Sequence, residues 1–154
     1  MPQEKNFLGR GMKFPPQINP ATGRFMTSEG PESIKESIYL ILMTQQSERP
    51  LRPTFGSDIM SYTFIDLNAG RLNMISRSVR DQIMTQEPRV TDVRINMEDG
   101  EGSGIILFNI DYTIISTNTR DNLVFPFYLN AAPVNTQEGE PEIYEPEEIE
   151  EITN

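Results

Sequence analysis

The first clear pattern in the chain is a helical repeat of apolar residues over residues 30–44. Gly30-Pro31 followed by Glu32 is a helix start signal, because Pro suits the first helical position and an acidic residue suits the positive end of the helix dipole. One face carries Ile34, Ile38, Ile41 and Leu42. Residues 38–43 are apolar all round, which predicts that this helix is covered on two sides.

A second helix is predicted from Asn68 or Ala69 to Met84. Apolar residues recur there at a spacing of three to four positions, and polar residues take the opposite side. The apolar positions are Leu72, Ile75, Val79 and Ile83. The helix ends at the triplet Glu87-Pro88-Arg89, since a proline disfavours helix at the residue before it.

The remainder of the chain has the alternation of β-strands. Val93, Ile95 and Met97 alternate with polar residues, residues 98–102 read as a turn, and residues 106–115 alternate again, which predicts an antiparallel pair. After a polar loop over residues 116–122, residues 123–129 read as a third strand. This strand contains Pro126 and belongs at a sheet edge, because proline cannot donate to a β-ladder.

The front of the chain is punctuated by proline and glycine. Residues 13–26 include Pro15, Pro16, Pro20 and Gly23. This composition predicts an extended arm with a turn at residues 21–23 and a short strand at residues 24–26.

Composition excludes several kinds of chemistry. The 154 residues suffice for one domain, and they include no Cys and no His, so disulfides, a thiol nucleophile, an imidazole base and the usual zinc sites are absent. The sequence has no glycine-rich phosphate loop and no nucleophile elbow, so we expect no cofactor, no metal and no small-molecule substrate. With no apolar run of transmembrane length and no signal-peptide pattern, we expect a soluble protein of the bacterial cytoplasm without membrane insertion.

The net charge of −10 is concentrated at the carboxyl terminus. Residues 138–151 hold eight Glu and no Lys or Arg, which leaves 15 acidic against 13 basic residues elsewhere. Such a segment is either a solvated, disordered terminus or a tail bound by a partner with a basic, partly apolar surface. In the second case Ile143, Tyr144 and Ile149 are the expected apolar anchors. Nucleic acid is a disfavoured partner, because phosphate repels this tail.

Two groups of charged residues are candidates for contacts with partner proteins. The first is the triplet, whose charges are fixed at a helix-to-strand corner and pair either within the chain or across an interface. The second lies in the interhelical loop, which is either a stiff connection whose aromatics cap the core or a preordered partner surface. The candidates are Glu87, Pro88 and Arg89, together with Glu48, Arg49 and Arg52.

The triplet occurs within an ordered set of short motifs. Before it come Leu-Ile-Leu-Met-Thr (40–44), Ser-Glu-Arg-Pro-Leu-Arg-Pro (47–53), Thr-Phe-Gly (54–56) and Tyr-Thr-Phe (62–64), and after it comes Asp-Asn-Leu-Val-Phe-Pro-Phe (121–127). In this order and at these spacings the chain resembles the gene-product-25-like family, the baseplate wedge and sheath-initiator proteins of contractile phage tails and contractile injection systems. The resemblance covers roughly residues 12–129.

The resemblance implies an α+β fold, in which two main helices pack on one face of a small antiparallel sheet of three to five strands. An extended amino-terminal arm and an acidic carboxyl-terminal tail flank it. The expected divisions are residues 1–27 for the arm and first strand region, 28–130 for the gene-product-25-like domain, and 131–154 for the tail.

The resemblance also implies a structural role in a sixfold baseplate, in a phage tail or tail-like injection particle. The implied partners are wedge proteins, inner tube or hub proteins, and a sheath protein whose extended arm pairs with a sheet edge. The expected acceptor edge is Leu123, Val124, Phe125, Pro126 and Phe127. The alternatives are a free regulatory binding module and a cell-wall hydrolase that uses carboxylates such as Glu48, Asp58, Asp66 or Glu87.

Overall fold

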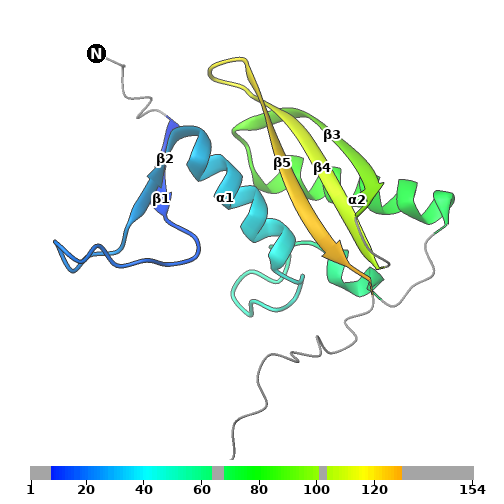
Figure 1. Ribbon diagram of the computed structural model, residues 1–154, viewed down its shortest axis with the longest axis horizontal. Helices are drawn as coiled ribbons and strands as arrows, with labels where there is room; N and C mark the ends of the chain where they lie inside the picture. The colour runs from blue at the N-terminus through cyan, green and yellow to red at the C-terminus, as the bar shows by residue number, and fades with distance from the viewer. Residues whose placement is uncertain (1–7, 64–67, 101–103, 130–154) are drawn as a thin grey trace, which may run out of the picture.

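In the computed structural model, a three-stranded antiparallel sheet carries two helices on one face (Figure 1). The structure describes residues 8–63, 68–100 and 104–129. The sheet has the order β3-β4-β5. Its strands are β3 (Val90–Asp99), β4 (Ile105–Ile114) and β5 (Thr119–Tyr128), and the helices are α1 (Gly30–Met43) and α2 (Ala69–Gln86). The mixed α+β class expected from the sequence is therefore confirmed.

Both helices form where the sequence predicts them. Pro31 lies in the first turn of α1, and the side chain of Asn68 caps α2 by accepting a hydrogen bond of 2.9 Å from the Arg71 N–H. The helix α2 continues two residues beyond the predicted end at Met84, because Pro88 restricts only the residue before it.

The core fills the space between the helices and the inner face of the sheet. Alternate residues of β4 point into it, as the predicted period of two requires. The core members from the helices and β4 include Ile34, Ile38, Leu42, Ile75, Val79, Ile83, Ile106, Phe108, Ile110, Tyr112 and Ile114. Phe125 and Phe127 complete it from β5.

The arm contains a small hairpin whose position differs from the predicted one. The strand predicted at residues 24–26 is displaced to β2 (Thr27–Glu29), which pairs with an unpredicted β1 (Arg10–Met12). Phe25 makes only an isolated bridge with Ile18, whereas the buried Ser28 donates a hydrogen bond to Glu36 of α1, which favours pairing next to the helix. The predicted turn is present, since the Gly23 N–H donates to the Asn19 carbonyl at 2.8 Å.

Two strands begin earlier than predicted. The strand β3 starts at Val90, with a bulge between Thr91 and Arg94 where Asp92 has a φ of 50°. The expected loop over residues 116–122 is shorter, because a tight turn with Asn118 at a φ of 49° lets β5 start at Thr119. Of the polar residues at the start of β5, Arg120 and Asn122 are exposed, and Asp121 pairs with Lys35 of α1.

The two helices are joined through a loop and the 3-10 helix η2 (Ile59–Tyr62). No helix among the described residues is long and apolar enough to cross a membrane. Residues 130–154, with the tail anchors Ile143, Tyr144 and Ile149, and Asp66 in the interhelical segment lie outside the described residues.

Candidate functional site

The two charged residues of the triplet pair with each other. The Arg89 Nε donates to Oε1 of Glu87 at 2.6 Å, and Nη2 donates to Oε2 at 2.6 Å. The Arg89 main-chain N–H also donates to Oε1, at 3.2 Å. This is the bidentate geometry that makes arginine–carboxylate pairs strong, and here it lies within one chain.

The Glu87–Arg89 pair joins three parts of the molecule. The Arg89 Nη1 donates to the Leu8 carbonyl in the arm at 2.9 Å and approaches the Ser33 hydroxyl of α1 at 3.5 Å. Burial acts to raise the pKa of Glu87, but hydrogen bonds from Arg89 and Ser37 outweigh it and hold that pKa below its usual value. The triplet thus fastens the arm and α1 to the corner between α2 and β3.

Only part of the pair is open to a partner. Glu87 is 2% exposed, whereas the Arg89 side chain is 29% exposed. Arg89 and Arg49 line one hollow of about 540 Å³ between the arm and α1, together with Gly11, Phe14, Ser33 and Leu40 among others. We call this the arm hollow. The structure therefore brings together Arg89 and Arg49, two of the predicted docking residues.

The interhelical loop over residues 45–58 is tied to its surroundings. Its Glu48 accepts a hydrogen bond from the Gln45 N–H at 3.1 Å, and the Arg49 guanidinium lies over the Phe55 ring, 4.9 Å from its centre. Gln86 of α2 binds the main chain of Gly56. These contacts are those expected of a stiff connection, and both the stiff-connection and the partner-surface interpretations stay predictions.

The strand β5 is an edge of the sheet, because it pairs only with β4. The Leu129 N–H donates to the Gly104 carbonyl at 2.6 Å, and the register from there to Thr119 is unbroken. Since hydrogen-bonded pairs alternate in an antiparallel ladder, the N–H groups of Val124 and Tyr128 point away from β4. Pro126, which lacks an N–H, occupies an outward position between them, as its edge placement predicts.

A second hollow lies on the α1 side of β5. It has a volume of about 390 Å³ and is lined by Phe14, Pro15, Lys35, Glu36, Tyr39 and Leu123. We call it the β5 hollow. Helix α1 is held beside β5 by an ion pair of 2.8 Å between Lys35 and Asp121 and by an edge contact between the rings of Tyr39 and Phe125.

The opposite edge, β3, is partly covered. The register of β3 with β4 points the Ile95 carbonyl outward, and the Ser76 hydroxyl of α2 donates to it at 3.3 Å. The N–H groups of Val124 and Tyr128 donate to no described residue.

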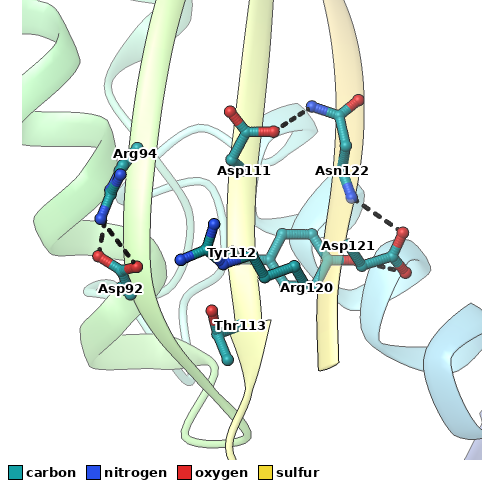
Figure 2. A pocket seen from close by; sticks show the side chains of 8 residues that line it. All are labelled: Asp92, Arg94, Asp111, Tyr112, Thr113, Arg120, Asp121 and Asn122. Carbon is teal, nitrogen blue, oxygen red and sulfur yellow. Dashed lines mark hydrogen bonds and ion pairs between the residues drawn. The ribbon is translucent and has the colours of Figure 1, made fainter. Parts of the chain in front are cut away.

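A hollow of about 540 Å³ at the sheet is lined by three carboxylates, those of Asp92, Asp111 and Asp121 (Figure 2). Each is engaged: Asp92 with Arg94 at 3.1 Å, Asp111 with the Asn122 amide at 2.8 Å, and Asp121 with Lys35. Burial acts to raise the pKa of Asp121, yet the hydrogen bonds from Lys35 and from the Asn122 N–H lower it overall. Within the described part of the chain, no group of acidic residues is arranged to hold a metal ion.

Several residues of these surfaces were not predicted. Ser33 and the Leu8 carbonyl contact Arg89, and Ser37 contacts Glu87. Gln86 holds the loop. Small or amide residues in a helix carry no signal that identifies such partners. The glycine of the Phe-Gly dipeptide at residues 55–56 does carry a signal for a tight turn of the main chain, since Gly56 has a φ of 106°.

Comparison with known proteins identifies the class. The family model described as baseplate wedge protein gp25 matches residues 28–119, and the chain belongs to this family. The chain is 28% identical over 88 residues to the baseplate wedge protein gp25 of Enterobacteria phage T4, covering 57% of this chain. The match spans 61% of the length of the phage T4 protein.

Solved structures share the fold of this chain. A crystal structure of a candidate tail lysozyme from Geobacter sulfurreducens is 37% identical, with a TM-score of 0.64, and covers 71% of this chain and 99% of its own. A chain of the anti-feeding prophage baseplate, at 24% identity, has a TM-score of 0.56 and covers 84% of this chain and 92% of its own. A chain of the type VI secretion system baseplate complex, at 18% identity, has a TM-score of 0.53 and covers 64% of this chain and 92% of its own. The last two show the fold. The chain is therefore a member of the gp25 baseplate wedge family that shares its fold with these structures.

Proposed function

We propose that this protein docks on wedge proteins around the tail tube and starts sheath polymerisation by accepting an extended sheath segment at β5. Main-chain hydrogen bonding fixes the position of an added strand almost independently of its sequence, and side-chain pockets then set its register. These are the properties required of the first contact in a regular polymer.

The observation that carries this proposal is the open main chain of β5. Val124 and Tyr128 offer outward N–H groups, and an unpaired edge is an aggregation liability that proteins normally block. Pro126 blocks only one position. The β5 hollow beside Leu123 would receive side chains from the incoming segment on the α1 side.

Docking on the wedge would use the arm hollow and the loop. Arg89 presents its partly exposed guanidinium there, Glu87 and Pro88 fix the direction of that guanidinium, and Arg49 lines the same hollow. Glu48 and Arg52 extend the surface along the loop. In this proposal the residues 28–130 form the docking unit, and the protein is made in the bacterial cytoplasm before it joins the particle.

The proposed role is structural and not catalytic. A glycosidase general acid has a raised pKa and faces a second carboxylate across a cleft. Hydrogen bonds here lower the pKa of both Glu87 and Asp121, and Glu87 is buried against Arg89. Because one similar structure is described as a candidate tail lysozyme, purified protein should be assayed on cell walls. Lysis that is lost in an Asp111→Asn or Asp121→Asn variant with wild-type stability would contradict the structural role.

Cryo-electron microscopy of the native particle tests the proposal. A sheath segment hydrogen-bonded to β5 as an added strand is the expected result. Sheath density that contacts only the β3 edge or the arm would overturn the assignment of β5, and absence of the protein from the baseplate would overturn the function itself.

A further inference from the structure

The apex of the interhelical loop presents one apolar side chain to solvent. Leu51 is 98% exposed, the largest exposed fraction among the large apolar residues of the described chain. It contributes no packing to its own fold. A single exposed leucine is ordinary in a soluble protein. Leu51 is a candidate for binding a partner only if the loop fixes its position.

Two consecutive turns hold Leu51 in place. The Arg52 N–H donates to the Arg49 carbonyl and the Phe55 N–H donates to the Arg52 carbonyl, each at 3.1 Å. Pro50 and Pro53 occupy the second position of these turns, where the fixed φ of proline is already suitable. The Ser47 N–H closes the loop on the Pro53 carbonyl at 2.8 Å.

The base of the loop is also fixed. Gln86 clamps Gly56 from α2, and the Ser57 N–H donates to the Thr44 carbonyl at 2.8 Å. A side chain presented by such a loop loses little conformational freedom when it binds, which is how preordered interfaces gain affinity.

Two positively charged residues lie within two positions of Leu51 in the sequence. Arg49 and Arg52 flank it, and neither forms an ion pair with a described residue, although the chain as a whole is acidic. Stacking on Phe55 fixes the guanidinium of Arg49. An exposed apolar anchor between two unpaired arginines is complementary to an apolar pocket with a carboxylate rim.

We infer that Leu51 inserts into an apolar pocket, rimmed by Asp or Glu side chains, on another protein of the baseplate. Arg49 and Arg52 pair with that rim. The inference rests on the proposed function and specifies the chemistry of the partner. The contact is separate from the β5 edge, so it governs whether the protein joins the baseplate and not whether sheath follows.

Incorporation of full-length variants into particles tests this inference. Leu51→Asp should lower the amount of protein in purified particles by about tenfold to hundredfold. The variant loses the burial of the leucine side chain, and its new carboxylate is repelled by the acidic rim of the pocket. The matched control Leu51→Met keeps an apolar side chain and should incorporate like the wild type. Arg52→Glu should lower incorporation, and Arg52→Lys should retain most of it.

Cross-linking identifies the pocket in the same particles. A photoreactive p-benzoylphenylalanine at position 51 should form a bond with an apolar segment of a second baseplate protein that has Asp or Glu beside it, more strongly than the same group at Thr22. Wild-type incorporation of Leu51→Asp, or a cross-link to a basic segment, would overturn the inference. A melting temperature lowered by Leu51→Asp would also overturn it, since it would assign Leu51 to internal packing. Wild-type protein missing from the particle would instead contradict the proposed function.

Discussion

The side-chain amide of Gln86 forms two hydrogen bonds with the main chain of Gly56, 30 positions away. The Gly56 N–H donates to Oε1 at 2.7 Å, and Nε2 donates to the Gly56 carbonyl at 2.8 Å. This paired contact closes the interhelical loop onto the end of α2, one residue before the triplet. The two candidate docking groups, far apart in sequence, are thereby fixed relative to each other.

Gly56 should tolerate no side chain. Its φ is 106°, and an added Cβ would lie 2.3 Å from the Thr44 carbonyl oxygen, so Gly56→Ala should lower the free energy of unfolding by at least about 2 kcal/mol. Gly23→Ala is the matched control, since its φ is 65° but no atom lies within 4 Å of the added Cβ, and it should cost about 1 kcal/mol. Urea unfolding of both variants measures the difference. Equal losses would show that the loop yields to the added methyl group.

Removal of either member of the triplet pair should destabilise the isolated protein. We expect Glu87→Ala to lower the free energy of unfolding by about 2 to 4 kcal/mol, somewhat less than for a fully buried pair because Arg89 is 29% exposed. Arg89→Lys should lose part of this amount, since an ammonium cannot reproduce the bidentate contact. A melting temperature that is unchanged in Glu87→Ala would mean that the pair serves only an interface.

The same pair should give stability a specific pH dependence. Because the pKa of Glu87 in the folded protein lies below its ordinary value of 4.5, its contribution is complete above that value and is lost as the pH falls through the lowered pKa. The difference in unfolding free energy between wild type and Glu87→Gln should therefore be largest above about pH 5 and shrink in acid. Asp81→Asn, which removes the exposed Arg80–Asp81 pair, is the control and should change stability by at most about 1 kcal/mol. A difference that stays constant down to strong acid would refute this assignment.

The acidic tail remains a prediction of the sequence. Truncation after Gln137 removes eight carboxylates and the anchors Ile143, Tyr144 and Ile149. If the tail binds a basic neighbour, truncation should weaken attachment to the particle more at low salt than at high salt, because salt already screens the intact contact. Pull-down of baseplate proteins across a salt series measures this. Equal attachment of both chains at every salt concentration would reduce the tail to a solubility feature.

The sequence was most informative where one face of an element is buried. The repeat from Ile34 to Leu42 and the alternation from Ile106 to Ile114 predicted α1 and β4 to within one or two residues, because burial imposes the period. The start of β5 was missed because residues 119–122 are polar on both faces, so they show no alternation and resemble a loop. The hairpin of β1 and β2 was misplaced because strands of three residues carry too few positions to show a period.

The candidate site could be predicted only where it depends on local properties of single residues. The charges of the triplet were recognisable, but whether they pair within the chain depended on Ser33, Ser37 and the Leu8 carbonyl, which only the fold brings together. The edge position of β5 could be predicted from Pro126 alone, because the lack of a main-chain N–H is a property of that residue in any fold.

Sheath formation in a Val124→Pro variant tests the central claim most directly. The substitution removes the outward N–H of Val124 and should leave the ladder with β4 intact, whereas the control Val124→Thr keeps both the N–H and a β-branched side chain. Electron micrographs of particles that contain the folded variant should show tube and baseplate without sheath, and Val124→Thr particles should be sheathed. Fully sheathed particles from the incorporated Val124→Pro protein would contradict strand addition at β5.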